Sequence, residues 1–231
     1  MDKLPIDQFL KEAFKRGRTS ETYKEVHIRA EELVKRCWAE DVFIVFTSGL
    51  RTNEEQAVLY GKGRSNYIYN GKQYANPNEK IVTNAKPGDS MHNYGLALDF
   101  VTCDGFGNKI NYTVGPKWRR AAEIAKELGF NWGGDWKSFV DYPHIEYSNG
   151  YTVERIKVGL WPTFKAFIPI DLSGKPVLTK DEKNVEPSAW AKEAVEWAMK
   201  NNITDGTYLK NAATREEVIT MIYRALNLKQ P

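Results

Sequence analysis

The stretch SMHNYGLALD, residues 90–99, decides the fold, because it joins two potential metal ligands to the start of an apolar strand. His92 and Asp99 differ by an odd number of positions, so on one straight strand they would face opposite sides. A turn must therefore separate them, and Tyr94-Gly95 supplies suitable residues. We expect residues 96–101 to form a strand that holds Asp99 rigidly, with the large apolar side chains of the strand in the core.

A second compact motif, DYPHIEY at residues 141–147, carries a further histidine. Imidazole nitrogen and carboxylate oxygen are both good zinc donors, and three protein ligands leave a fourth coordination position open for water. His92, Asp99 and His144 are therefore the candidate ligands of one Zn²⁺ ion. A lone histidine is more often a hydrogen-bonded structural residue, which is our interpretation of His27, but two histidines and an aspartate in compact motifs favour a metal site.

Two carboxylates of the second motif compete for the role of general base. Asp141 precedes His144 with a proline between them, so it can approach a zinc-bound water without being a ligand itself. Glu146 shares the strand face of His144 and can instead orient that imidazole from behind. We predict that Asp141 is the general base and later the acid, with Glu146 as the alternative.

Apolar periodicity around these motifs predicts an α+β fold, in which helices flank a small antiparallel sheet. Helices are expected at residues 6–16, 20–38, 53–60 and 116–128, and strands at residues 42–46, 96–101 and 143–147. Thr19 or Ser20 is expected to cap the second helix. Residues 61–90 read as a long polar excursion with a hairpin at Asn70-Gly71, and such long loops are often functional.

The chain is expected to contain a catalytic domain, a linker and a small helical module. Residues 1–160 form the catalytic domain, and the prolines between residues 161 and 187 are typical of a linker. Residues 188–231 contain two segments of helical spacing, with Ser188 and Thr214 as N-caps, which predicts an α-helical hairpin.

Composition and charge narrow the class of function. Lysine and arginine total 33 against 30 acidic residues, and the resulting charge of +3 is too balanced to indicate a nucleic-acid partner. No apolar stretch is long enough to span a membrane, and the first residues carry no export signal, so we expect a cytoplasmic protein that lysis of the producing cell releases. Cys37 and Cys103 have no C-x-x-C partner and are expected to be buried thiols. The protein is expected to be a monomer.

The pattern S-x-H-x-x-G-x-A-x-D followed by D-x-x-H resembles the zinc motif of the family that contains D-alanyl-D-alanine carboxypeptidases and L-alanyl-D-glutamate endopeptidases. The resemblance covers roughly residues 42–147 and implies zinc-dependent hydrolysis of a peptide bond in peptidoglycan stems. The segment SGLR, residues 48–51, resembles the S-x-x-R segment of that family. It implies that Arg51 stabilises the oxyanion, and Gln56, Ser90 and Trp132 are expected to contact the substrate.

Two further likenesses indicate which bond is cut. Asp141 stands where the L-alanyl-D-glutamate endopeptidases of phages and bacilli have aspartate, and WGGDW at residues 132–136 also resembles those enzymes. Its tryptophans either form one wall of the cleft or pack in the core, which is the commoner position of tryptophan. The bond between L-alanine and D-glutamate is therefore favoured over a D,D-carboxypeptidase activity. A zinc-containing wall-binding protein that does not cut is the non-enzymatic alternative, and the presence of both Asp141 and Arg51 argues against it.

The C-terminal residues resemble an S-layer homology motif, through the tryptophans Trp190 and Trp197 and the segments NITDG at residues 202–206 and ATREE at residues 213–217. Modules of that kind attach proteins to secondary polymers of Gram-positive walls. A peptidase with a wall-binding tail and no export signal resembles a phage endolysin. The expected partners are thus peptidoglycan and a secondary wall polymer.

Overall fold

The structure, a computed structural model, describes residues 2–162, 164, 167, 196–197 and 200. The chain divides into two units, Met1–Lys175 and Pro176–Pro231, and every helix and strand named below belongs to the first. The predicted helical module at residues 188–231 and most of the predicted linker at residues 161–187 lie outside the described residues. Both stay predictions.

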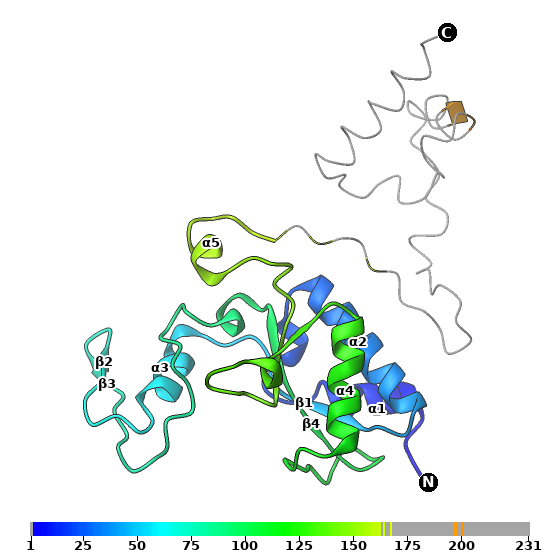
Figure 1. The fold of residues 1–231 in the computed structure, drawn as a ribbon, viewed down its shortest axis with the longest axis horizontal. Helices are drawn as coiled ribbons and strands as arrows, with labels where there is room; N and C mark the ends of the chain where they lie inside the picture. The colour runs from blue at the N-terminus through cyan, green and yellow to red at the C-terminus, as the bar shows by residue number, and fades with distance from the viewer. Residues whose placement is uncertain (1, 163, 165–166, 168–195, 198–199, 201–231) are drawn as a thin grey trace. The chain divides into compact units, whose positions relative to one another are not determined.

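A four-stranded antiparallel sheet lies at the centre of the first unit, with the strand order β1-β4-β6-β5. Its neighbouring strands β1 and β4 are labelled in Figure 1. The strands are β1 Ile44–Ser48, β4 Ala97–Thr102, β5 Asn131–Trp132 and β6 His144–Glu146. Leu98 and Phe100 are fully buried, whereas Asp99 between them points to the opposite face. The sheet thus has an apolar face in the core and a face that carries polar side chains.

β1 contains a β-bulge opposite Asp99. Phe46 pairs with Phe100, yet the next residue to pair is Ser48 with Asp99, which leaves Thr47 as the extra residue. A bulge bends the strand and re-aims its side chains. Here it brings Ser48 beside Asp99 at the end of the strand.

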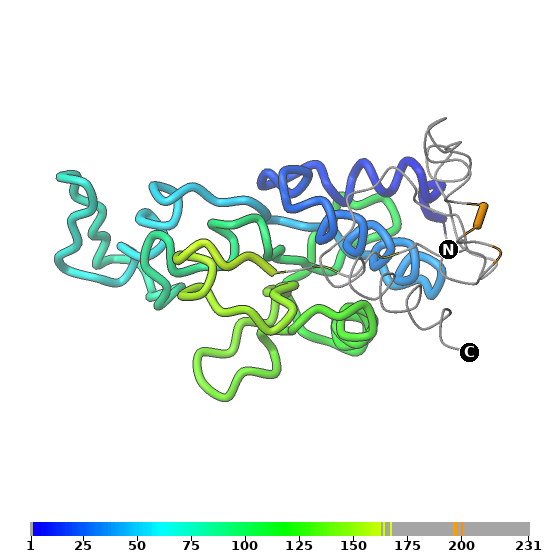
Figure 2. The backbone as a smooth tube through the Cα atoms, turned by 90° about the horizontal axis from the view of Figure 1, so that it is seen from above, coloured from blue at the N-terminus to red at the C-terminus, as the bar shows by residue number. Residues whose placement is uncertain are grey.

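Three helices cover the apolar side of the sheet (Figure 1). They are α1 Ile6–Ala13, α2 Lys24–Ala39 and α4 Pro116–Glu127, and Figure 2 shows α1 and α2, in blue, running close together. α1 and α2 contact β1, and α4 contacts β4. Trp118 of α4 is almost fully buried, with its ring centroid 5.3 Å from that of Phe100.

The long segment between β1 and β4 contains a helix and a small hairpin. α3 Asn53–Gly61 begins at a capping box between Thr52 and Glu55. The hairpin of β2 Ile68–Tyr69 and β3 Lys72–Gln73 extends away from the central sheet (Figure 1). Its turn residues Asn70 and Gly71 have φ values of 49° and 76°, as a two-residue turn that follows the strand twist requires.

Aromatic side chains that follow α5 Val153–Lys157 pack back onto this unit. The ring centroid of Phe164 lies 5.0 Å from that of Tyr23 and 5.4 Å from that of Tyr147. Phe167 lies 4.7 Å from the guanidinium of Arg29. Phe164 and Phe167 of the predicted linker therefore pack on the first unit.

The structure confirms the mixed helical and antiparallel character of the first unit and the hairpin at Asn70-Gly71. The predicted cap of the second helix is wrong, because Thr19 belongs to a separate 3-10 turn, η1 Thr19–Glu21, and α2 begins only at Lys24. Cys37 is buried as predicted, whereas Cys103 is only partly buried. Within the described part of the chain, no helix has the length and apolar character needed to cross a membrane.

Candidate metal centre and active site

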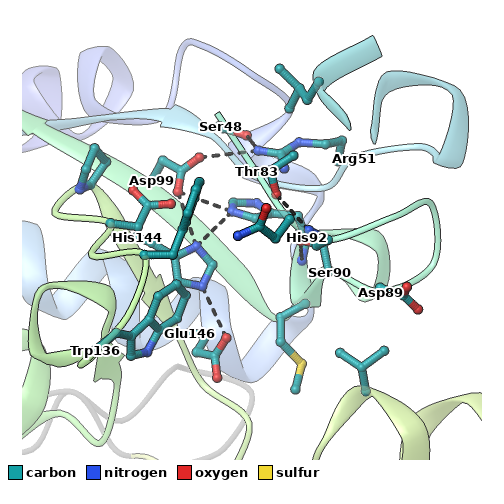
Figure 3. Close-up of a pocket in the computed structure, with 18 of the residues that line it drawn as sticks. Ser48, Arg51, Thr83, Asp89, Ser90, His92, Asp99, Trp136, His144 and Glu146 are labelled. Atoms are coloured by element: carbon teal, nitrogen blue, oxygen red, sulfur yellow. Dashed lines mark hydrogen bonds and ion pairs between the residues drawn. The ribbon is translucent and has the colours of Figure 1, made fainter. Parts of the chain in front are cut away.

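The side chains of His92, Asp99 and His144 converge on one point of the polar face of the sheet (Figure 3). Nε2 of His92 lies 3.2 Å from Oδ1 of Asp99 and 3.2 Å from Nδ1 of His144, and the latter two atoms are 3.4 Å apart. Donor atoms placed about 2.0–2.1 Å from one zinc ion at tetrahedral angles stand about 3.3–3.4 Å apart. The three atoms therefore have the spacing of one face of a tetrahedral zinc site.

The fold brings these residues together by strand pairing and one tight turn. Asp99 of β4 and His144 of β6 are direct cross-strand partners, so their side chains leave the same face side by side. His92 comes from the 3-10 turn η2 Met91–Tyr94, in which Oγ of Ser90 accepts from the His92 backbone N–H at 3.3 Å. Gly95 ends this turn with φ 68° and leads into β4, which confirms the predicted turn.

Both histidines are oriented by hydrogen bonds on the ring nitrogen that faces away from the convergence point. Nδ1 of His92 donates to the carbonyl oxygen of Gly49 at 2.8 Å, and Nε2 of His144 donates to Oε2 of Glu146 at 3.1 Å. Because a carbonyl oxygen can only accept, Nδ1 of His92 carries the proton of this bond, and Nε2 is the nitrogen that can offer a lone pair to the convergence point. Partners of this kind fix the tautomer and the orientation of metal-binding histidines.

The electrostatics of the triad favour a negative charge on Asp99 and a proton on His144. Burial alone would raise the pKa of Asp99, but the charges and hydrogen bonds of His92 and His144 hold it well below its usual range. Burial alone would lower the pKa of His144, but its hydrogen bonds to Asp99 and Glu146 raise it to about 9. A histidine binds metal in its neutral form, so metal binding must displace a proton from this group.

The triad lies in a cleft of about 1070 Å³ that Asp141 also lines. Burial, helped by the nearby Asp99 carboxylate, raises the pKa of Asp141, although the neighbouring cations oppose the shift. Gly133 allows the Asp141 segment to approach His144 closely. A Cβ at position 133 would lie 2.4 Å from the Asp141 carbonyl oxygen and 3.1 Å from Cβ of His144. Any other residue here would therefore force the backbone at position 133 and the Asp141 segment apart.

Arg51 lies at the edge of the triad and is held on two sides. Its Nη1 donates to Oε1 of Gln56 at 2.9 Å, and its Nη2 donates to Oγ of Ser48 at 2.9 Å and to Oδ2 of Asp99 at 3.3 Å. Gln56 is fully buried, and its Nε2 donates to the carbonyl oxygen of Ala85 at 2.7 Å. One amide therefore ties the guanidinium to a segment that lines the cleft.

Known proteins with similar sequences share this region. The family model described as D-alanyl-D-alanine carboxypeptidase matches residues 83–147, which contain all three donor residues and Asp141. The peptidoglycan L-alanyl-D-glutamate endopeptidase CwlK of Bacillus subtilis (strain 168) is 38% identical over 134 residues, which cover 55% of this chain and 74% of CwlK. The chain belongs to this peptidase family.

Two further relatives are similar to this family member. The L-alanyl-D-glutamate peptidase of Listeria phage A118 is 30% identical over 125 residues, which cover 53% of this chain and 37% of the phage protein. The crystal structure of the Serratia marcescens L-Ala D-Glu endopeptidase ChiX aligns with a TM-score of 0.37 and 21% identity, over 57% of this chain and 87% of that one.

Of the three residues predicted to contact the substrate, one lines the cleft and two do not. Ser90 lines the cleft beside His92 (Figure 3), but Gln56 and Trp132 are not among its lining residues. Gln56 is fully buried with both ends of its amide bonded to the protein, and Trp132 is 7% exposed with Nε1 donating to the Tyr142 carbonyl oxygen at 2.7 Å. The tryptophan of the WGGDW segment that does line the cleft is Trp136, whose ring centroid lies 5.0 Å from that of His144.

Sequence reasoning missed Asn93, which joins the Arg51 turn to the cleft segment before η2. Its Nδ2 donates to the carbonyl oxygen of Arg51 at 3.0 Å, and its Oδ1 accepts from the backbone N–H groups of Gly88 at 3.0 Å and Ser90 at 3.3 Å. Ser90 and Asn93 form a reciprocal capping arrangement. The spacing S-x-x-N is close to a capping-box pattern and was the available signal.

Proposed function

We propose that this peptidase is a zinc-dependent peptidoglycan endopeptidase that hydrolyses the bond between L-alanine and D-glutamate in stem peptides. The observation that carries the proposal is the triangle of donor atoms from His92, Asp99 and His144, with sides of 3.2, 3.2 and 3.4 Å. The names of the Bacillus and Listeria phage relatives support the choice of bond. Peptidoglycan is therefore the proposed partner.

Nε2 of His92, Oδ1 of Asp99 and Nδ1 of His144 would hold the zinc ion. Two imidazoles and a carboxylate are a donor set that zinc accepts well, and three protein ligands suit a catalytic rather than a structural site. When bound, zinc polarises a carbonyl oxygen and lowers the pKa of a water molecule to about 7. Glu146 then keeps the His144 ring in the orientation that points Nδ1 to the triad.

Asp141 would act first as the general base and then as the general acid. Its carboxylate takes a proton from the attacking water and returns it to the amine of D-glutamate as the bond breaks. The pKa of Asp141 is raised toward neutral pH. A group whose pKa lies near the working pH can both accept and release a proton efficiently. Glu146 is less suited to this role because it already accepts a hydrogen bond from His144.

Arg51 would stabilise the negative charge that develops on the carbonyl oxygen of L-alanine. Its guanidinium carries more N–H donors than its bonds to Gln56, Ser48 and Asp99 use. Because those bonds fix the group in advance, little reorganisation is needed when the charge appears. Ser90, which lines the same cleft, would contact the peptide.

The biological role that we propose is host-cell lysis by a phage or prophage endolysin. The Listeria phage relative supports this role, because it is a phage protein named for the same bond. Attachment to a secondary wall polymer is proposed for residues 188–231 on their resemblance to an S-layer homology motif.

Mass analysis of muropeptides after digestion of purified walls tests the bond. We expect fragments with a new N-terminal D-glutamate from the zinc-loaded protein. Asp141→Asn should retain zinc and lose hydrolysis, whereas His92→Ala and His144→Ala should lose both. Release of free D-alanine with intact stems would instead show the carboxypeptidase activity that the family description names. Walls that stay uncut by a zinc-loaded protein that binds them would show a binding role.

A further inference from the structure

The cleft is lined by polar and by aromatic side chains. Thr83, Asp89 and Ser90 lie on one side of the histidine pair, and Trp136 lies on the other (Figure 3). Three further aromatic residues, Tyr112, Phe139 and Tyr151, also line the cleft, and Tyr151 follows β6 rather than preceding it. The cleft therefore offers polar groups from the segment before η2 and three aromatic rings from the segments before α4 and before β6.

These three rings are exposed to solvent although they are large and largely apolar. Tyr112 is 67% exposed, Phe139 is 44% exposed and Trp136 is 39% exposed. Single exposed apolar side chains are common on protein surfaces, but several that line one cleft mark a binding site. We call Tyr112, Trp136 and Phe139 the aromatic wall.

The backbone at Phe139 is also unusual for an aromatic residue. Phe139 has φ 53°, in the left-handed region that a bulky residue rarely occupies. Such a conformation costs free energy and persists where the surroundings enforce it, often at ligand sites. Here the strained residue is one whose ring stays exposed in the cleft rather than packing in the core.

The chemistry of the proposed substrate limits what can occupy the aromatic wall. The residues around the scissile bond are alanine and glutamate, and neither has a side chain that would cover three aromatic rings. L-Alanine is attached to the lactyl group of an N-acetylated amino sugar, so the glycan strand begins one residue from the bond. A pyranose ring has a face of C–H groups that stacks on aromatic rings, while its hydroxyl and amide groups stay hydrated, and clefts lined by aromatic side chains suit such ligands.

We propose that Tyr112, Trp136 and Phe139 form a subsite for the amino sugar that carries the stem peptide. This inference rests on the proposed function, since it names the part of the same substrate that these aromatic lining residues contact. It assigns the enzyme a preference for peptides that are still attached to the glycan over free peptides.

The test compares two substrates with one bond in common, a soluble muramyl disaccharide-peptide and the same peptide without sugar. The variant is the double substitution Tyr112→Ala with Phe139→Ala. Trp136 is left intact because its ring adjoins that of His144. Phe106→Ala is the matched control, because Phe106 is 42% exposed but does not line the cleft. We expect kcat/KM of the double variant to fall about tenfold on the disaccharide-peptide, with little change on the free peptide and no change on either for Phe106→Ala.

An equal loss on both substrates, or no loss on either, would overturn the subsite. Titration of the wild-type protein with the muramyl disaccharide alone, followed by NMR, separates this failure from failure of the proposed function. If the wild type cuts neither substrate, binding of the disaccharide that the double variant loses still supports the subsite. If the disaccharide does not bind to the wild type and the wild type has no preference for the sugar-linked peptide, the aromatic wall serves another ligand and the inference fails.

Discussion

Nη1 of Arg51 donates to Oε1 of Gln56 across 2.9 Å, and the other end of the same buried amide holds the Ala85 carbonyl oxygen at 2.7 Å. A primary amide carries a hydrogen-bond acceptor and a hydrogen-bond donor at its two ends. It can therefore accept a hydrogen bond from a guanidinium and donate one to a backbone carbonyl at the same time. We therefore propose that Gln56 acts through Arg51 and the cleft segment as a positioning residue, and its predicted contact with substrate stays a prediction.

We expect Gln56→Met to lower both stability and activity. Methionine fills similar space but leaves an arginine N–H and a backbone carbonyl without their partner. Full burial of such a group costs about 1–3 kcal/mol of unfolding free energy, and the cost here is smaller because both bonds are only partly buried. Loss of the guanidinium position should lower kcat by about tenfold to a hundredfold, with a smaller change in KM. Thermal unfolding and steady-state kinetics measure the two effects, and Gln73→Met on the exposed strand β3 is the control. A rise in KM alone would return Gln56 to substrate binding.

Glu146→Gln distinguishes an orienting role from a catalytic one. Glutamine keeps an oxygen that can accept from Nε2 of His144 but removes the charge, so zinc should bind about 10–100-fold more weakly while kcat at saturating zinc is largely kept. Zinc competition with a coloured chelator and kinetics at several zinc concentrations give both values. If Glu146→Gln abolishes hydrolysis with zinc fully bound, while Asp141→Asn stays active, the roles of the two carboxylates are exchanged.

Zinc affinity is expected to increase with pH because of His144. In the metal-free protein its pKa is raised to about 9, so at lower pH each zinc ion must displace a proton and affinity should rise by up to about tenfold per pH unit. The sign reverses for the stability of the metal-free protein. A raised histidine pKa stabilises the fold below about pH 6.5 and this contribution is lost as pH rises through about 9.

Chelator competition between pH 6.5 and 8 tests this dependence, and chelator-treated protein shows the opposite trend in thermal unfolding. His27→Gln, on α2 and outside the triad, should give the same slope as the wild type. An affinity that does not change over this interval would mean that His144 is already neutral in the metal-free protein.

The sequence predicted the triad well because its geometry depends on local features. Strand periodicity placed Asp99, the glycine turn placed His92, and the DYPHIEY motif placed His144 on a strand that pairs directly with that of Asp99. Burial of Gln56 and Trp132 was not predictable in this way. Whether a polar or aromatic side chain reaches a cleft or the core depends on contacts between segments far apart in the chain, such as Gln56 with Ala85.

The same limit applies to short elements that tertiary contacts define. β5 has two residues, too few for an alternating pattern, and exists because Asn131 and Trp132 pair with β6. The bulge at Thr47 depends on the partner strand as well, and it is what sets Ser48 opposite Asp99.

Gly133→Ala tests whether the approach of Asp141 to the triad controls catalysis. The added methyl group would lie 2.4 Å from the Asp141 carbonyl oxygen, 3.2 Å from Cβ of Asp141 and 3.1 Å from Cβ of His144, so the Asp141 segment must move. A displacement of about 1 Å at a reacting group lowers rates by about a hundredfold, and we expect kcat/KM to fall by that order. Gly115→Ala is the control, since a Cβ there meets no atom within 4 Å. The zinc content of the variant shows which residue is affected. Loss of hydrolysis with zinc retained assigns the effect to Asp141, whereas loss of zinc assigns it to His144. Full activity would mean that the close approach allowed by Gly133 is not needed for the reaction.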